Sequence, residues 1–235
     1  MKNNFELLCQ GDSRLLKING NPGERYFIEP GAMAAMTPTW KLNIKTGGIN
    51  KMFGRLLTGE SVLLQEYKAI SEGELLLAPV YNGDIIGVKV GEKQYRISNT
   101  NFLACTGDVS LKAKARVKGM FGTGEGFFSL VSDGEGVLFV HSCGGLHRIT
   151  LKEGEEYIVD SGHLVIWDTS LKYSTKLAGG GIIKSMFSGE GFVASFVGPG
   201  DLWIQSRKPI TTTVNTTTTH KDGTSTTVSY DLYNN

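Results

Sequence analysis

Cysteine, proline and net charge are all scarce in this 235-residue sequence, which has three cysteines, six prolines and a formal charge of +1. Cys9, Cys105 and Cys143 are widely spaced and form no Cys-x-x-Cys pair, which is typical of free thiols in a reducing compartment. A charge near zero gives no overall field that would attract nucleic acid or an anionic membrane. No Pro/Ser-rich linker divides the chain, so its parts are expected to share a core.

Long hydrophobic runs are also missing. No apolar run approaches the roughly 18 residues that a membrane-spanning helix needs. The first ten residues lack the apolar core of a secretory signal. We therefore expect a cytoplasmic protein.

Motifs for catalysis are absent as well. The sequence has no Gly-x-Ser-x-Gly elbow and no His-x-His pair, and its four histidines are scattered. A glycine-rich run at 179–185 has Ile183 where a phosphate-binding loop needs glycine. The run 189–194 matches the dinucleotide fingerprint but leads into a strand-like segment, so no helix N-terminus could receive a pyrophosphate. We predict no catalytic residue and no cofactor.

Glycine, by contrast, is abundant, with 31 residues, nearly twice its usual share of about 7%. It takes part in a pattern that occurs three times, a Met-Phe pair followed shortly by a Gly-Glu pair. The glutamates of the three copies are Glu60, Glu125 and Glu190, and both intervals between them are 65 residues. A fixed period of this length predicts three copies of one supersecondary unit.

Strand signals fill these copies. Apolar runs on both sides of a turn predict hairpins, most clearly at 126–140 and 191–205, and an alternating run at 109–115 predicts a further strand. The best helical candidate, 49–57, is short. The expected fold class is all-β, with little helix and three repeated β units of about 65 residues in a pseudo-threefold β-sandwich or barrel arrangement. The predicted domain spans 1–208, divided into units at 1–80, 81–145 and 146–208.

The composition changes after residue 208. Ten threonines lie between Thr211 and Thr227, interrupted by His220–Gly223. Threonine is β-branched and Asp-Gly is a strong two-residue turn, so an appended β-hairpin at 209–235 is one of two interpretations that we keep open. A disordered polar tail is the alternative. A hairpin would offer edges for pairing with another subunit.

The three glutamates allow two interpretations. At equivalent places about a pseudo-threefold axis, Glu60, Glu125 and Glu190 could converge on a cation. Otherwise each caps a turn or pairs with a nearby lysine, such as Lys118 or Lys184. Because catalysis requires different roles from its groups, we favour structural positions over a catalytic set and keep a binding role as the alternative.

A second cluster has the chemistry of metal ligands. His141 and Cys143 share a strand face by the period of two, and a Gly-Gly turn could bring His147 towards them. Such ligands would suit zinc, with His163 as a candidate fourth. The alternative is that these residues lie at a strand end beside a turn. We favour this alternative and predict no metal.

The C-terminal third of the chain carries a family resemblance. It contains Gly179-Gly180-Gly181, then the run 186–192, Gly198-Pro199-Gly200 and the run 202–207. This pattern resembles the signature of the altered-inheritance-of-mitochondria (mitochondrial biogenesis) family. With the earlier Gly47-Gly48 and Gly59-Glu60, the similarity extends over about residues 1–208 and excludes the threonine-rich tail.

The resemblance implies an all-β fold related to that of the tryptophan-operon RNA-binding attenuation protein, with internally repeated β units. It implies no catalytic residues. Fungal members are mitochondrial and linked to inner-membrane organisation, whereas bacterial members of this length have no targeting segment and no assigned activity. Similarity of fold to an RNA-binding ring does not transfer its function.

The absent motifs, the repeat and the tail together favour a non-catalytic binding or scaffold protein of unknown ligand that assembles as a homo-oligomer. A different protein partner is the second partner that we consider. Two alternatives stay open. One is a small-molecule or metal-dependent enzyme in the mouth of a β-barrel. The other is contact with membrane or RNA through the basic, apolar stretch 45–57, which the near-zero net charge disfavours.

Overall fold

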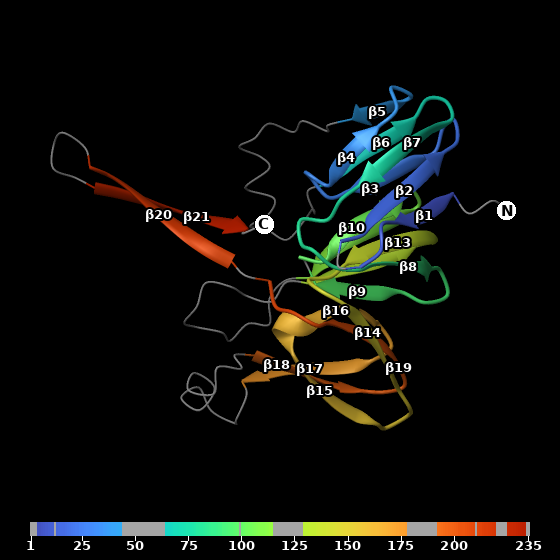
Figure 1. Cartoon of the computed structure of the whole chain (residues 1–235). Coiled ribbons are helices and arrows are strands. Elements are labelled where there is room, and N and C mark those ends of the chain that lie inside the picture. Colours follow the sequence, from blue (N-terminus) through green and yellow to red (C-terminus); the bar gives the residue numbers. More distant parts are fainter. Residues whose placement is uncertain are drawn as a thin grey trace.

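The chain folds almost entirely into β-strands (Figure 1). The computed structural model describes residues 4–11, 13–43, 64–98, 100–114, 129–177, 192–209, 211–219 and 225–233. Within these ranges the only helical segment is one 3-10 turn, Ser161–His163 (η1). The prediction of an all-β fold with little helix is confirmed. The helix predicted at 49–57 lies outside the described residues.

Two sheets contain the first eight strands of the chain together with two later ones. One has the order β1 (Phe5–Leu8), β2 (Leu15–Gly20), β7 (Gly73–Leu77), β4 (Met33–Met36). The other has the order β5 (Trp40–Asn43), β6 (Gln65–Ala69), β3 (Arg25–Ile28), β10 (Phe102–Thr106), β13 (Gly136–His141), β8 (Ile85–Val90). Every pairing in these sheets is antiparallel.

Three further sheets contain the remaining strands. The largest has the order β11 (Val109–Lys114), β12 (Ser129–Gly134), β9 (Tyr95–Ser98), β16 (Leu164–Asp168), β19 (Gly200–Gln205), β14 (Leu146–Leu151). A three-stranded sheet has the order β15 (Glu156–Asp160), β18 (Phe192–Val197), β17 (Lys172–Leu177). The threonine-rich segment forms a two-stranded sheet of β20 (Thr211–Thr219) and β21 (Ser225–Tyr233), which stands apart from the others in Figure 1.

The same strand pairings occur three times along the chain. We divide the strands after β1 into unit 1 (β2–β7), unit 2 (β8–β13) and unit 3 (β14–β19). In each unit the first and third strands pair with the sixth, and the second and fourth pair with the fifth. The domain boundaries and the pseudo-threefold arrangement predicted from the sequence stay predictions.

Adjacent units are joined by strand pairing, which we call the inner seams. β3 of unit 1 pairs with β10 of unit 2, and β9 of unit 2 pairs with β16 of unit 3. Each seam therefore joins the second strand of one unit to the third strand of the next. In Figure 1 the units follow one another, with β4 in the upper part of the body and β15 at its lower end.

Alternating side chains produce the core. In β2, Leu16 and Ile18 are fully buried while Lys17 between them is only partly covered, as expected for a strand with one face on a core. The buried apolar residues form three clusters, represented by Leu16, Ile18, Leu75 and Leu77, by Ile97, Leu138, Val140 and Ile166, and by Trp167, Phe196 and Leu202. No single unit supplies the second cluster, because β16 of unit 3 packs into it together with strands of unit 2.

Glycine sets the tight connection between β12 and β13. Gly134 has a φ of 99°, a conformation that side chains disfavour. A Cβ there would also lie 2.2 Å from the Asp108 carbonyl oxygen. The turn within the segment 126–140 therefore depends on glycine both for its backbone conformation and for its close packing. The hairpins predicted at 126–140 and 191–205 are wrong, because β12 and β13 belong to different sheets, as do β18 and β19, and each of these strands pairs with more distant segments.

The described residues include no helix long and apolar enough to cross a membrane. Localisation in the cytoplasm stays a prediction.

Candidate interaction surface

The two inner seams bury the side chains that they join. All residues of Phe102–Cys105 in β10 and of Leu164–Trp167 in β16 are buried. Tyr26 of β3 and Tyr95 of β9, which face these strands, are 3% and 6% exposed. Strand pairing between units thus covers apolar surface that a single unit would leave in water.

The strands at the two ends of the series lack such a partner. Among the described residues β4 pairs only with β7, and β15 pairs only with β18, so each lies at the edge of its sheet. Every residue of β4 is exposed, and so are Glu156–Ile158 of β15. An unpaired edge strand presents free N–H and C=O groups that can pair with another chain.

Large apolar side chains gather on these two edges. Met33 and Met36 of β4 are 38% and 39% exposed, and Tyr157 and Ile158 of β15 are 42% and 67% exposed. These are four of the seven large hydrophobic residues that are exposed in the described part of the chain. Monomeric proteins usually blunt an edge with charged residues. β4 has no charged residue, and β15 exposes Tyr157 and Ile158 beside Glu156.

Local geometry shows that β4 is built like the third strands of the other units. Each of the three strands has a bulge at the same place, between Met33 and Ala35, between Phe102 and Ala104, and between Leu164 and Ile166. The residues that follow by this alignment are Thr37, Thr106 and Asp168. Each accepts a hydrogen bond of 3.1 Å through its side-chain oxygen, from the backbone N–H of Glu74, Val137 and Asp201 respectively. The edge of β4 therefore has the backbone form that is paired in β10 and β16.

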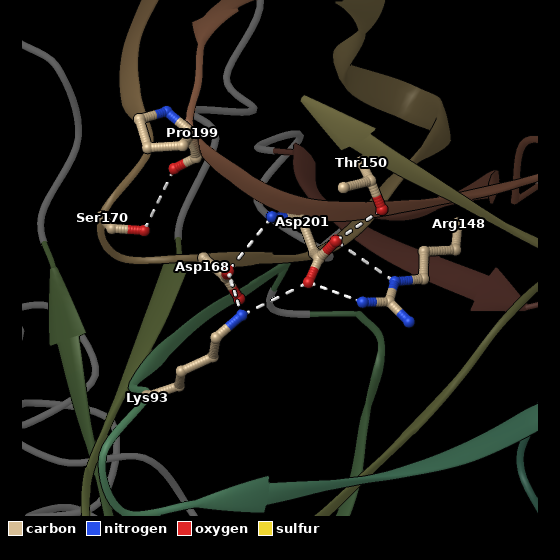
Figure 2. Close-up of polar contacts among 7 residues, drawn as sticks. All are labelled: Lys93, Arg148, Thr150, Asp168, Ser170, Pro199 and Asp201. Atoms are coloured by element: carbon tan, nitrogen blue, oxygen red, sulfur yellow. Dashed lines mark hydrogen bonds and ion pairs between the residues drawn. The ribbon is translucent and has the colours of Figure 1, made fainter. Parts of the chain in front are cut away.

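A polar cluster crosses the second inner seam (Figure 2). Lys93 Nζ of unit 2 lies 3.1 Å from Asp168 Oδ2 and 3.3 Å from Asp201 Oδ2 of unit 3. Arg148 Nη2 lies 2.7 Å from Asp201 Oδ2, and Thr150 Oγ1 donates to Asp201 Oδ1 at 2.7 Å. Burial alone would raise the pKa of Asp201, but the hydrogen bonds from Arg148 and Thr150 outweigh it and lower the pKa to about 2. The cluster fixes the charged form of this carboxylate at the seam.

An open hollow of about 700 Å³ lies beside this cluster and shares Lys93 with it. Its other charged lining residues are Lys89, Glu92 and Glu135, so cations and carboxylates are equal in number. This balance gives no preference for a ligand of either charge. We therefore assign the hollow no ligand.

Of the residues singled out in the sequence, the three glutamates Glu60, Glu125 and Glu190 lie outside the described residues. So does the stretch 45–57 proposed for membrane or RNA contact. Their proposed roles stay predictions.

His141 is the last residue of β13 and is 1% exposed. Its Nε2 lies 3.7 Å from Oε2 of Glu29, the residue after β3. Burial lowers the pKa of His141 to about 4 and raises the pKa of Glu29 to about 7. Both groups are therefore driven towards their neutral forms, and we interpret the contact as a buried polar pair at the first inner seam rather than as an ion pair.

The other metal candidates are Cys143, His147 and His163. The Cys143 backbone N–H donates to the Gln205 side chain at 2.9 Å, His147 is exposed on β14, and His163 Nδ1 lies 2.7 Å from the Gln205 carbonyl oxygen. In the part of the chain that the structure describes, no group of three or more His, Cys, Asp or Glu residues could hold a metal ion. His141, Cys143 and His147 thus do not form a metal-binding group.

The sequence interpretation missed the edges and the seam cluster. The apolar segment 32–36 and the run 155–160 are visible in the sequence, but nothing local distinguishes a buried apolar strand from one at an open edge. Lys93 and Asp168 are 75 residues apart and belong to no motif. The exposure of β4 and β15 could be found only from the strand order.

Known proteins resemble this chain over most of its length. The family model described as mitochondrial biogenesis AIM24 matches residues 5–207. An uncharacterized protein of Streptococcus pyogenes serotype M6 is 33% identical over 202 residues, which cover 82% of this chain and 81% of that protein.

A solved structure is similar as well. The crystal structure of another Streptococcus pyogenes protein superposes with a TM-score of 0.76 at 31% identity, covering 87% of this chain and 93% of that one. The matched residues 5–207 include β1–β19, with both inner seams and both open edges, and exclude the threonine-rich hairpin. The chain therefore belongs to the mitochondrial biogenesis AIM24 family.

Proposed function

We propose that the protein is a non-catalytic binding or scaffold protein that works as a homo-oligomer. The observation that carries the proposal is the pair of open sheet edges with exposed apolar side chains, β4 and β15. Inside the chain, edges of the same two kinds are paired and buried at the inner seams. A protein that leaves one edge of each kind free has the surface for association with further copies of itself.

Energetics supports association through these edges. Burying a side chain of the size of Met33, Met36, Tyr157 or Ile158 contributes about 1.5–3 kcal/mol when the side chain is fully exposed beforehand. These four are partly exposed, so each would contribute less. Backbone hydrogen bonds along the strands would add to this gain and set the orientation of the two chains.

Light scattering on the full chain tests the proposal. We expect a mass that is a multiple of the chain mass and that falls on dilution towards that of one chain. Sedimentation velocity at the same concentrations provides a second measure of size. A protein that stays monomeric at every concentration would overturn the proposal.

A further inference from the structure

We infer that copies of this chain join head to tail, with β15 of one copy pairing antiparallel with β4 of the next. The inference rests on the proposed self-association and adds its partner strands, polarity and register. Within the chain, the second strand of a unit pairs with the third strand of the following unit. β15 is the second strand of the last unit and β4 is the third strand of the first unit, and these are the two strands that lack this partner among the described residues. The outer seam would repeat the inner seams between molecules.

The inner seams predict the register of the outer one. Tyr26 lies opposite Thr106 in the first seam, and Tyr95 lies opposite Asp168 in the second. The corresponding residues at the open edges are Tyr157 and Thr37. Antiparallel pairing from this point places Ile158 opposite Met36, and Val159 opposite Ala35.

Exposure at matching positions supports this register. Tyr157 is 42% exposed, whereas Tyr26 and Tyr95 in the inner seams are 3% and 6% exposed. Met33 is 38% exposed, whereas its counterparts Phe102 and Leu164 are buried. The open edges thus carry large side chains like those of the inner seams. These side chains are exposed, as expected before a partner strand covers them.

Backbone hydrogen bonds are available along most of the seam. In the first inner seam Glu29 N donates to Leu103 O at 2.9 Å, which corresponds to Asp160 N donating to Ala34 O between copies. Gly107 and Thr169 each donate a backbone N–H to the preceding unit. Pro38 occupies their position in unit 1 and has no N–H, so one bond at the end of this ladder is missing. Met36 and Ile158, the central pair, each have a backbone N–H that can donate to the other strand.

The polarity follows from the two edges being different. Pairing of β15 with β4 leaves a free β4 on one copy and a free β15 on the other, so each contact is heterologous. Such contacts form a ring when the rotation between copies closes, and a filament when it does not. In Figure 1 the two edges lie towards opposite ends of the body, which allows both to be used at once.

Disulfide cross-linking tests the strands and the register. In a chain in which the accessible Cys9 and Cys143 are replaced by serine, Met36→Cys and Ile158→Cys are introduced together. Directly opposite residues in a hydrogen-bonded antiparallel pair have Cα atoms about 5.5 Å apart, within the range that a disulfide spans. Mild oxidation should give a ladder of covalent dimers, trimers and larger species that reductant abolishes.

Controls separate this contact from others. Each single variant should give no ladder and no dimer, because a head-to-tail contact never brings two Met36 or two Ile158 positions together. Leu7→Cys combined with Ile158→Cys is the matched control, since Leu7 is 40% exposed on β1, at the other edge of the sheet that contains β4. It should give no ladder.

The outcomes distinguish the seam from the proposed function. A ladder from the double variant alone supports the inference. Dimers from a single variant would show a symmetric contact and overturn it. An oligomer in light scattering without any cross-link would overturn the seam while leaving self-association intact, and a strict monomer would overturn both.

Discussion

Lys93 and Asp168 form an ion pair across the seam between units 2 and 3, with Lys93 Nζ 3.1 Å from Asp168 Oδ2. Lys93 precedes β9 and Asp168 ends β16, so the pair joins the two strands of the seam near their ends. The Asp168 side chain is 3% exposed, whereas that of Lys93 is more than half exposed. The hydrogen bond to Asp168 raises the pKa of Lys93 above its ordinary value. A buried carboxylate is thus neutralised by a lysine from the neighbouring unit.

Replacing this lysine should weaken the packing of unit 3 on unit 2. In Lys93→Met, Asp168 and Asp201 both lose a cation, and Asp168 is buried. Because the lysine end is exposed to water, we expect a loss of about 1 kcal/mol in the free energy of unfolding. Urea denaturation measures it. Lys112→Met is the control, since Lys112 pairs with Asp133 where both side chains are more than half exposed, and its midpoint should move much less. Equal shifts in the two variants would contradict the assignment.

The buried Glu29 and His141 predict opposing effects of pH on stability. The pKa of Glu29 is about 7 in the folded chain and about 4.3 when unfolded, so the folded state binds more protons between these values and stability falls as pH rises through them. The pKa of His141 is about 4 when folded and about 6.5 when unfolded, so its effect on stability rises with pH over that window. The two slopes largely cancel in the wild type between about pH 4.5 and 6.5.

Glu29→Gln should therefore expose the histidine slope. Its free energy of unfolding should rise from about pH 4 to 6.5, and its difference from the wild type should shift in its favour by on the order of 2 kcal/mol between pH 4.5 and 7. Chemical denaturation at a series of pH values measures this. Glu135→Gln, at an exposed position, is the charge-matched control. Parallel pH profiles for Glu29→Gln and the wild type would show that Glu29 does not titrate as described.

Local sequence patterns account for the strands that could be predicted. The strands expected at 191–205 are present as β18 and β19, and the alternating run at 109–115 contains β11, because side-chain alternation and turn residues act over a few positions. The hairpin expected from β18 and β19 is wrong, because the two strands belong to different sheets. Pairing between units depends instead on contacts between residues far apart in the chain. Ile28 and Ala104 face each other across 76 positions, and no pattern near either residue indicates the other.

The open edges could not be predicted from local sequence patterns either. The sequence predicts that the apolar residues Met36 and Ile158 lie in the core. An edge strand that pairs with another chain has the same apolar composition as a central strand, so composition does not distinguish the two. Their exposure follows from the order of strands in the sheets, which is a property of the whole chain. The sequence therefore predicted the all-β class, whereas the candidate surface required the topology.

A single positive charge on β15 should weaken assembly. In Tyr157→Lys the outer seam would have to bury a lysine at the position where Tyr26 and Tyr95 are 3% and 6% exposed in the inner seams. It would also lose the burial of a tyrosine that is now 42% exposed. The lost apolar contact is worth less than the about 1.5–3 kcal/mol of a fully exposed side chain, and the cost of burying the lysine adds to it, so the dissociation constant should rise on the order of tenfold. Light scattering on dilution measures it. Leu7→Lys, at an exposed apolar position on β1, should leave assembly unchanged. Thermal unfolding of both variants at low concentration should match the wild type, since neither position is buried within one chain.

A charge reversal beside β15 should strengthen assembly. Glu155 lies two residues before Tyr157, as Lys93 lies two residues before Tyr95. Glu155 therefore occupies in unit 3 the position that Lys93 occupies in unit 2, where Lys93 contacts the carboxylates of the next unit. The acceptor side is already present in unit 1, where Glu74 corresponds to Asp201. Lys17 Nζ lies 2.6 Å from Glu74 Oε2, and Arg148 Nη2 lies 2.7 Å from Asp201 Oδ2. In the head-to-tail seam Glu155 would thus approach a like charge, and Glu155→Lys would replace repulsion by attraction. We expect tighter association, by severalfold at low salt, with the gain shrinking as salt screens the pair. Glu153→Lys makes the same charge change at an exposed neighbouring position and controls for net charge. Equal effects of the two substitutions would indicate a general charge effect, and would place Glu155 away from Glu74 in the assembly.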